Sequence, residues 1–265
     1  MSESDAPLDV ERLWAGLDID LFGTLTVLDE VDSTNVALVA AACAGADRGV
    51  LTTEFQSAGR GRLDRVWTAP PRSGLAVSVL LCPPVPTRRW SWLPLVTGLA
   101  VVDALAAAGL PDGVGPGLKW PNDVLVGGSK VAGILAERVD ERRVVVGMGL
   151  NVSLQAGDLP VPTATSLLIA GARMLDRTTL LAAYLAALSA HCRRWWAEAD
   201  DTTVRERYRR VSTTIGRSVE VALPDGSSRT GAAIDVDPAG ALVVDTGATG
   251  LLVVAAGDVR HVRVD

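Results

Sequence analysis

The sequence predicts an α+β fold, with a mixed β-sheet and flanking helices over residues 1–212 and a small SH3-like β-barrel over residues 213–265. The chain has 265 residues and is 48% hydrophobic, which provides enough apolar material for a buried core and is too apolar for a disordered chain. In the first part, strand-like and helix-like segments alternate. From Gly216 onward, five short strand-like segments are separated by the turn sequences PDG, DPAG and TGATG. The boundary is therefore expected near residues 211–216.

The first helices and strands are predicted from apolar segments that are bounded by glycine or proline. Residues 10–17 predict a short helix with Trp14 packing inward. Ser33 or Thr34 begins the next helix, because small hydroxyl side chains cap helix N-termini, and Gly45 ends it. The loop after the second strand, rich in glycine and arginine, has no periodicity. Strands are expected over residues 24–29, 50–55 and 74–81, and the loop over residues 57–65.

Two longer helices and the remaining strands complete the prediction. Residues 90–108 are mostly apolar, and residues 178–209 carry a core stripe at spacings of three and four, so each segment predicts one helix. Gly127-Gly128 predicts a tight hairpin turn between two strands. Strands are expected over residues 118–126, 131–139, 144–150, 219–223, 229–235, 241–245, 250–254 and 259–264.

Composition and charge exclude several classes of protein. The net charge is -6 and the pI is about 5.0, so the chain lacks the overall basic footprint of a nucleic-acid-binding protein. The longest apolar stretch, residues 93–110, contains Asp103 and predicts a buried helix rather than a membrane span. The N-terminus shows no secretory signal. Cys43, Cys82 and Cys192 have no metal-binding spacing and fit a reducing cytoplasm.

Lysine is used sparingly in this chain. Of the 25 basic residues only two are lysines, Lys119 and Lys130, and they lie close together. Arginine carries a planar fork, whereas lysine is a compact point charge on a flexible stem. The pattern indicates that an ammonium group is needed in this segment, although on the count alone two chance survivors in an arginine-rich sequence explain it equally well.

Five segments concentrate polar residues or glycines where strands do not need them, and two of them lie before residue 70. The sequence DSTN at residues 32–35 is either a helix N-cap or a group of hydroxyls and amides that binds a polar ligand. Gln56 precedes the sequence GRGR at residues 59–62. The glycines would let the backbone approach an anionic ligand, and the guanidinium groups would bind it. The alternatives are a solvated loop and an RNA-binding loop. Trp67 then either packs in the core or stacks on a purine.

The other three segments lie between residues 119 and 151. In KWPND at residues 119–123, Pro121 ends a strand, so the side chains of Asn122 and Asp123 are expected to face one small volume. The alternative is a turn without a functional role. Lys130 begins a strand, and Gly133 leaves room for a ligand above the backbone. In GMGLN at residues 147–151, two glycines open a strand that ends in an asparagine.

In this order, the pieces DSTN, Q-x-x-GRGR-x-x-R-x-W, KWPNDV, K-x-AGIL and GxGxN resemble the biotin–protein ligase family. Together they are specific, and each of the two lysines falls in a motif. Residues 213–265 are similar to the SH3-like C-terminal domain of that family. The resemblance implies a catalytic ligase domain over residues 1–212, with its site between residues 32 and 151. It would adenylate biotin with ATP to biotinoyl-5′-AMP and transfer biotin to a lysine of a biotin carboxyl carrier domain.

The resemblance also implies roles for individual residues. The catalytic residues would be Lys130, which neutralises charge between the biotin carboxylate and the α-phosphate, Arg62, and Asp123, which orients or deprotonates the acceptor lysine. The implied biotin-binding residues are Ser33, Thr34, Asn35, Gln56, Gly59, Arg60, Gly61, Arg62, Lys130 and Gly133. The implied ATP-binding residues are Arg60, Arg62, Arg65, Trp67, Lys119, Asn122, Lys130 and Asn151. Mg²⁺ would accompany ATP, and no protein-ligated metal is implied.

Partners follow from the same resemblance. The expected partner is the carrier domain of acetyl-CoA or acyl-CoA carboxylases, a homodimer is left open, and no membrane partner is expected. Only 31 residues precede Asp32, too few for the winged-helix DNA-binding domain of some relatives, so no specific DNA binding is expected. Leu63-Asp64 departs from the basic or glycine residues that relatives often carry there.

Three alternatives are weighed against the ligase. A lipoate–protein ligase would have a similar fold, but the chain lacks the run of three glycines after paired arginines that this family shows. A non-catalytic nucleic-acid-binding module would use the arginine loop and the barrel, which the pI disfavours. A ligand sensor would bind without turnover.

Overall fold

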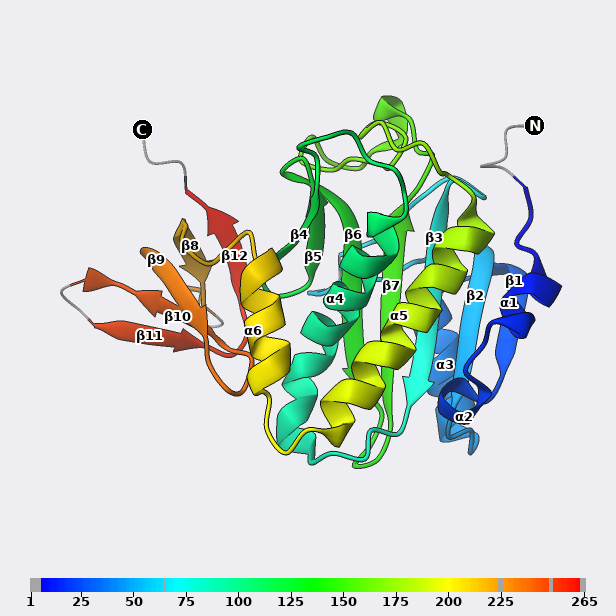
Figure 1. Cartoon of the computed structure of the whole chain (residues 1–265), viewed down its shortest axis with the longest axis horizontal. Coiled ribbons are helices and arrows are strands. Elements are labelled where there is room, and N and C mark those ends of the chain that lie inside the picture. The colour runs from blue at the N-terminus through cyan, green and yellow to red at the C-terminus, as the bar shows by residue number, and fades with distance from the viewer. Residues whose placement is uncertain (1–5, 64, 224–225, 248–249, 263–265) are drawn as a thin grey trace.

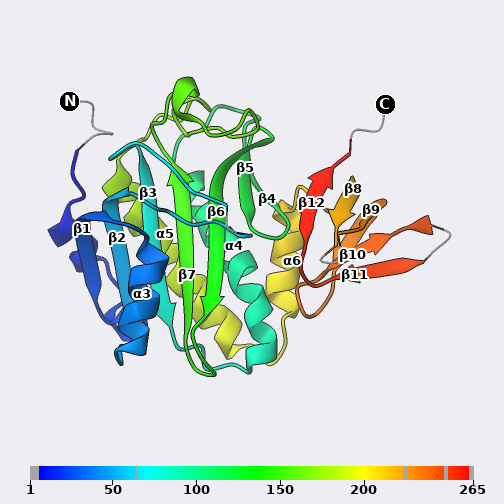
Figure 2. The ribbon, with the colours of Figure 1, turned by 180° about the vertical axis from the view of Figure 1, so that it is seen from behind.

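The computed structural model describes residues 6–63, 65–223, 226–247 and 250–262. It confirms the predicted α+β class, because a seven-stranded mixed sheet lies between helices and a five-stranded antiparallel sheet follows it (Figure 1). Helices α4 (Leu93–Ala106) and α5 (Arg177–Ala197) cover one face of the large sheet (Figure 1). Helix α3 (Thr34–Cys43) covers the other face, as the view from behind shows (Figure 2).

The large sheet combines one parallel pair with antiparallel pairs. Its strands are β1 (Leu25–Val31), β2 (Gly49–Gln56), β3 (Gly74–Leu81), β4 (Pro116–Lys119), β5 (Asp123–Val126), β6 (Ser129–Arg138) and β7 (Val144–Asn151). Their order across the sheet is β1-β2-β3-β7-β6-β5-β4. β1 and β2 are parallel, since α3 connects them, and the other neighbours are antiparallel. β3 and β7 lie at the centre and are buried along most of their length, which explains their nearly continuous apolar sequences.

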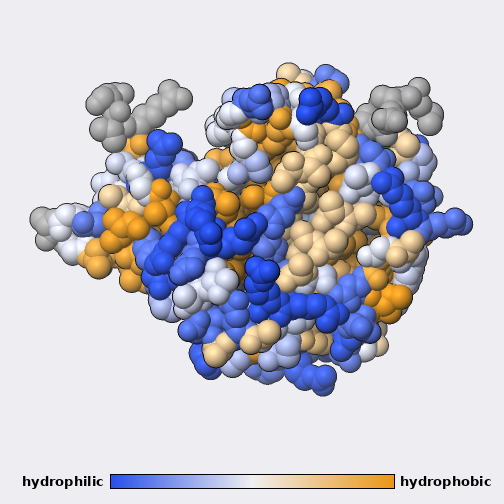
Figure 3. All heavy atoms as spheres, in the orientation of Figure 1, coloured by the Kyte–Doolittle hydropathy of each residue, from blue (hydrophilic) through white to orange (hydrophobic). Residues whose placement is uncertain are grey.

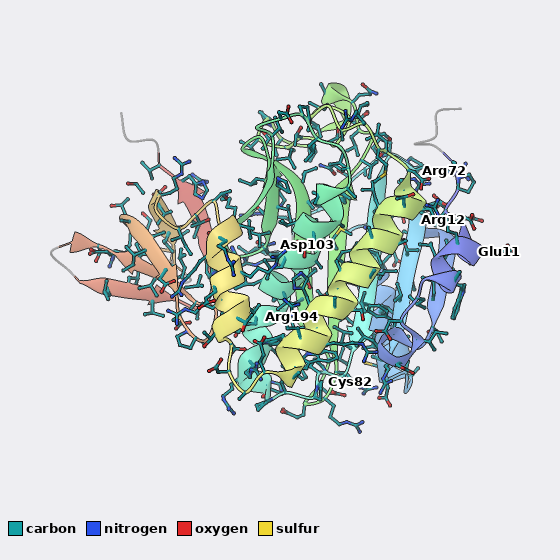
Figure 4. All side chains as sticks on the ribbon, in the orientation of Figure 1. Glu11, Arg12, Arg72, Cys82, Asp103 and Arg194 are labelled. Carbon is teal, nitrogen blue, oxygen red and sulfur yellow. The ribbon has the colours of Figure 1, made fainter. Side chains whose placement is uncertain are left out.

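The hydrophobic core lies between the large sheet and the pair α4 and α5. α4 begins with proline in its first turn, and its apolar side chains are buried almost throughout. Its one acidic side chain is Asp103, which is labelled in Figure 4. Asp103 accepts hydrogen bonds from His191 of α5, at 2.7 Å, and from Arg207 of α6 (Thr202–Val211). The three helices are therefore joined at their polar edge as well as through the core. The other helices are α1 (Val10–Ala15), α2 (Ile19–Phe22), and the 3₁₀ segments η2 (Thr87–Trp92) and η3 (Ala156–Asp158).

The predicted single helix over residues 178–209 is wrong, because the chain breaks between α5 and α6. The guanidinium of Arg89 donates to the carbonyl oxygens of Trp195 and Glu198, at 3.2 and 3.1 Å, and pairs with Asp201 at 2.8 Å. Carbonyls at the end of α5 are thus satisfied by a side chain from η2 rather than by a further helical turn.

Three other predictions need correction. Residues 118–126 form two antiparallel strands, β4 and β5, because Pro121 has no N–H for a ladder and the chain turns there. Trp14 does not pack inward: it is 37% exposed, and Leu13 takes the buried position in α1. The predicted helix over residues 90–108 begins as the 3₁₀ segment η2 and becomes α-helical only at Leu93.

The five predicted C-terminal strands are confirmed. They are β8 (Ser218–Ala222), β9 (Ser228–Val236), β10 (Leu242–Asp245), β11 (Leu251–Val254) and β12 (Asp258–His261), in the order β11-β10-β9-β8-β12. The predicted end of the last strand at residues 263–264 lies outside the described residues. Two tryptophans fasten this sheet to the large domain, since Trp92 Nε1 donates to the carbonyl of Pro238 at 2.8 Å and Trp120 Nε1 to that of Gly240 at 3.0 Å.

The surface differs in character between the two sheets. Hydrophobic side chains gather over the C-terminal strands, where Leu251 and Val253 are exposed, and a strongly hydrophilic region covers α6 beside them (Figure 3). Within the described ranges, no helix has the length and apolar character needed to cross a bilayer. Nor does any group of three or more His, Cys, Asp or Glu side chains in the described part of the chain form a metal-binding cluster.

Candidate active site

A cavity of about 840 Å³ opens beside β6 and β7 and is closed on one side by the C-terminal sheet. Its volume is typical of a site for a small organic ligand or nucleotide. Of the predicted site residues only Gly59 does not line it. The predicted residues that do are Ser33, Thr34, Asn35, Gln56, Arg60, Gly61, Arg62, Arg65, Trp67, Lys119, Asn122, Asp123, Lys130, Gly133 and Asn151.

The floor of the cavity consists of glycines on neighbouring strands. A Cβ atom at Gly149 of β7 would overlap the indole ring of Trp67, and one at Gly147 would overlap the side-chain amide of Asn35. A Cβ at Gly133 of β6 would lie 3.1 Å from the Trp67 ring and 3.2 Å from Lys130 Nζ. The glycines therefore let an indole, an amide and an ammonium group lie directly on the sheet.

Lys130 reaches the cavity because of an irregularity in β6. Ala132 pairs with Val124 and Lys130 with Leu125, so one extra residue of β6 stands between the two pairs. Such a bulge turns the side chain before it toward the face that Gly133 occupies. There the ammonium lies 2.5 Å from Asp123 Oδ1 and 5.7 Å from the centroid of the Trp67 ring.

The described residues of the arginine loop after β2 form a hairpin-like turn. Arg60 bridges to Val66, Gly61 N donates to the carbonyl of Arg65 at 2.7 Å, and Trp67 N donates to that of Gly59 at 2.8 Å. Gly59 is buried behind the cavity wall, where a Cβ would overlap the carbonyl of Trp67 and the amide of Gln56. Gly59 therefore shapes the wall from behind and does not itself face the cavity.

The C-terminal sheet holds this loop. Arg62 Nη1 donates to Asn122 Oδ1 and Arg62 Nη2 to the carbonyl oxygen of Gly257, both at 3.2 Å. Arg65 forms an ion pair with Asp258 at the start of β12. Burial lowers the pKa of Arg62, an effect that the carboxylates of Asp258 and Asp123 oppose. An arginine pKa is so high that the guanidinium stays protonated all the same.

Positive charge exceeds negative charge at the cavity wall. Among the described residues no carboxylate pairs with the cavity cations Arg60, Lys119 or Arg260, whereas Asp123 and Asp258 are each occupied by a cation. Such a wall attracts an anionic ligand.

Two asparagines are fixed by the backbone. Asn122 Nδ2 donates to the carbonyl of Ile134, and Asn151 Nδ2 donates to that of Thr165, both at 2.9 Å. The side-chain oxygen of Asn122 accepts from Arg62, so its amide links the KWPND turn to the arginine loop.

The DSTN segment combines a helix start with ligand-facing hydroxyls. Ser33 occupies the N-cap position of α3, yet its side chain makes no capping hydrogen bond, so the N-cap alternative does not account for its hydroxyl. Thr34 N donates to Gln56 Oε1 at 2.9 Å. Ser78 of β3, which the sequence prediction missed, lies behind Thr34, with its Oγ 2.7 Å from Thr34 Oγ1.

Other residues of the site were also missed. No local sequence signal marks the segment at residues 160–164, although the carbonyl of Thr163 accepts from Lys130 N at 2.8 Å. The C-terminal strands contribute a whole wall, which the five motifs do not reveal because it lies about seventy residues or more beyond the last of them. That wall comprises Glu220, Ala222, Asp258, Val259 and Arg260.

Comparison with known proteins identifies the family of the chain. Residues 31–152 match the Biotin/lipoate A/B protein ligase family, and residues 214–262 match the Biotin protein ligase C terminal domain. The biotin–[acetyl-CoA-carboxylase] ligase of Mycobacterium tuberculosis is 43% identical over 90% of this chain and 89% of its own length. The bifunctional ligase/repressor BirA of Bacillus subtilis is 30% identical over 87% of this chain and 72% of its own.

Solved structures show the same architecture. The biotin protein ligase of Aquifex aeolicus in complex with biotin and ATP superimposes with a TM-score of 0.76 at 27% identity, covering 91% of this chain and all of the other. The Leishmania major enzyme in complex with biotinyl-5-AMP gives a TM-score of 0.58 at 25% identity, covering 88% of this chain and 99% of the other. The fold, both domain matches and the 43% identity together show that the chain belongs to the biotin protein ligases of the biotin/lipoate ligase family.

Proposed function

We propose that the protein is an ATP-dependent biotin–protein ligase that works in two steps. In the first, a carboxylate oxygen of biotin attacks the α-phosphorus of ATP, the bond to the β-phosphate breaks, and biotinoyl-5′-AMP and pyrophosphate form. In the second, the neutral ε-amine of a carrier lysine attacks the acyl carbon and AMP leaves. The names of the relatives support both substrates and the transfer.

The observation that carries this proposal is the placement of Lys130. Its ammonium lies in the same cavity as Arg60, Arg62 and Lys119, and the only carboxylate paired with it among the described residues is Asp123. A carboxylate and a phosphate repel each other, and a cation between them removes that barrier. At an effective dielectric near 20, opposite charges about 4 Å apart attract by roughly 4 kcal/mol. Lys130 accordingly stabilises the transition state of adenylation.

Other residues are proposed to bind the two substrates. Ser33, Thr34 and Gln56 bind the ureido ring, because their polar atoms cluster at one end of the cavity. Arg60, Arg62 and Arg65 bind carboxylate and phosphate oxygens, and the interaction of Arg62 with two neutral oxygens leaves its charge available. Asn35, Gly61, Gly133 and the buried Gly59 shape the biotin site. Lys119, Asn122 and Asn151 bind the nucleotide, and Trp67 offers its ring to adenine.

ATP enters as its magnesium complex, so the metal is part of the substrate. Asp123 holds Lys130 in the free enzyme. When Lys130 turns to the phosphate, this carboxylate is released and orients the incoming amine of the acceptor. The acceptor is a lysine of a biotin carboxyl carrier domain of an acetyl-CoA or acyl-CoA carboxylase, as the name of the mycobacterial relative suggests.

The function is tested by ATP–pyrophosphate exchange with biotin, with lipoate and with neither. Exchange that depends on biotin, followed by transfer of biotin to a purified carrier domain, is the expected result. Exchange stimulated by lipoate alone would assign the lipoate reaction instead. The absence of exchange with either acid would contradict a ligase, and a salt-sensitive shift of nucleic acid would then favour a binding module.

A further inference from the structure

A line of polar side chains, buried except at its Glu137 end, runs from β6 to the biotin end of the cavity. Asn35 Nδ2 lies 2.6 Å from Glu137 Oε2 and 3.4 Å from the carbonyl oxygen of Leu135. On its other side, Asn35 Oδ1 lies 2.6 Å from Ser78 Oγ. Ser78 Oγ in turn lies 2.7 Å from Thr34 Oγ1, which lines the cavity. Asn35 and Thr34 are each 4% exposed and Ser78 is fully buried, so water does not supply partners to these three side chains. Glu137 is partly exposed.

The number of protons on these side chains determines the direction in which hydrogen bonds are donated along the line. A carboxylate and a carbonyl only accept, so the amide nitrogen of Asn35 must face Glu137 and its oxygen must face Ser78. Asn35 Oδ1 also only accepts, and the single hydroxyl proton of Ser78 is therefore directed to it. Because the Ser78 proton is already used, Thr34 must be the donor in the contact between the two hydroxyls, and Ser78 Oγ accepts. Donation runs from Thr34 to Ser78, then to Asn35, and ends at Glu137.

The distances agree with this assignment. The hydroxyls of Thr34 and Ser78 make three contacts. Ser78 Oγ lies 2.6 Å from Asn35 Oδ1 and 2.7 Å from Thr34 Oγ1, whereas Thr34 Oγ1 lies 3.1 Å from Gln56 Oε1, the longest of the three distances. Two hydroxyl protons cannot serve three contacts, and the contact to Gln56 is the one without a proton. Gln56 Oε1 accepts instead from Thr34 N, at 2.9 Å, which fixes the orientation of that amide.

We propose that Glu137 and Ser78 are positioning residues that make the Thr34 hydroxyl oxygen an acceptor toward the cavity. Because Thr34 has given its proton inward, it faces a ligand with lone pairs only, and it selects a ligand that donates an N–H. This proposal rests on the proposed function, whose substrate biotin is a cyclic urea with two N–H groups. The dithiolane ring of lipoate has none, so the same device distinguishes the two acids.

Gly147 is part of the device. A Cβ at this position of β7 would overlap Asn35 Oδ1, so glycine is required for the amide to lie flat on the strand between Glu137 and Ser78.

The test compares two substitutions at one position. Lysine at position 137 can only donate, so it turns the amide of Asn35 and reverses the line, whereas methionine of similar length merely removes the acceptor. Calorimetric titration with biotin should give a Kd for Glu137→Lys on the order of tenfold higher than for Glu137→Met, with ATP affinity unchanged in both. A purely structural role would weaken both variants equally, and equal Kd values would overturn the proposal.

Controls separate the possible failures. Glu141→Lys and Glu141→Met make the same changes at an exposed neighbouring acid and should bind biotin like the wild type. If Glu137→Lys fails to fold, Ser78→Ala gives a second test, since it removes the acceptor of the Thr34 proton and should raise the biotin Kd several-fold. A wild-type Kd for Ser78→Ala would overturn the proposal. Wild-type protein that binds no biotin would instead contradict the proposed function.

Discussion

Arg62 Nη2 donates to the carbonyl oxygen of Gly257, 3.2 Å away and 195 residues further along the chain. The other terminal nitrogen donates to the amide oxygen of Asn122, which is also uncharged. The guanidinium of Arg62 is thus oriented by two uncharged acceptors. Neither of them neutralises its positive charge, which remains available to an anionic ligand. The C-terminal sheet therefore takes part in the site by holding the arginine loop.

The link between the loop and the C-terminal sheet can be weakened at Asp258. Asp258→Asn removes the charge that pairs with Arg65, and we expect a several-fold rise in KM for biotin and ATP with kcat little changed. The effect is modest because exposed ion pairs contribute about 1 kcal/mol or less, and Arg65 is 64% exposed. Trypsin should also cleave after Arg60 and Arg62 faster, and biotin with ATP should slow this cleavage.

The matched control for that variant is Asp245→Asn, an acid of the same sheet at the end of β10 that does not line the cavity. Equal cleavage rates and equal KM values for the Asp258 and Asp245 variants would show that the sheet does not hold the loop.

The charge of Lys130 is tested by removing it. Lys130→Ala should lower biotin-dependent ATP–pyrophosphate exchange on the order of a thousandfold, because about 4 kcal/mol of charge stabilisation is lost at roughly 1.4 kcal/mol per factor of ten. Lys130→Arg keeps the charge but not the compact shape and should retain more exchange than alanine. Circular dichroism should show an unchanged fold, and exchange at the wild-type rate in a folded Lys130→Ala protein would exclude the role.

The glycine floor gives a steric prediction. Gly149→Ala places a methyl group in the volume of the Trp67 indole, so the ring must leave the sheet and binding of biotin and ATP should fall at least tenfold. Gly157→Ala is the control, because nothing lies within 4 Å of the added atom there. Thermal unfolding distinguishes a lost site from a lost fold. An alanine variant at Gly149 with wild-type affinity would mean that Trp67 is not required in this position.

His261 predicts a dependence of stability on pH. His261 remains exposed at the end of β12, but partial desolvation lowers its pKa, and the positive charges of Lys119 and Arg217 lower the pKa further. The unfolded chain therefore takes up this proton at a higher pH than the folded protein does. The free energy of unfolding should fall as the pH drops below about 6.5, the ordinary pKa of histidine, toward the lower folded value.

The variant His261→Gln isolates this effect, because glutamine can keep the contact with Thr214 Oγ1, which is 3.1 Å from the imidazole, and does not titrate. Urea unfolding between pH 5 and 7.5 should show a steeper loss of stability for the wild type than for the variant. Parallel pH profiles would place the origin of the acid sensitivity elsewhere.

The sequence by itself determined the local elements and the polar motifs. Alternating and continuous apolar patterns predicted β3 and β7 closely, because a strand inside a sheet is defined by its own side chains. Gly127-Gly128 predicted the hairpin, and both glycines have positive φ there. Fifteen of the sixteen predicted site residues line the cavity, since a polar side chain or glycine stands out in a strand that would otherwise be apolar.

Only the tertiary structure decided which distant groups complete the site. The break between α5 and α6 depends on Arg89, about a hundred residues earlier, and the orientation of Lys130 depends on the pairing of β6 with β5. Ser78 and Glu137 read as ordinary strand residues until the sheet brings them to Asn35. These interactions join segments far apart in sequence, and a local pattern contains no information on which segments pack together.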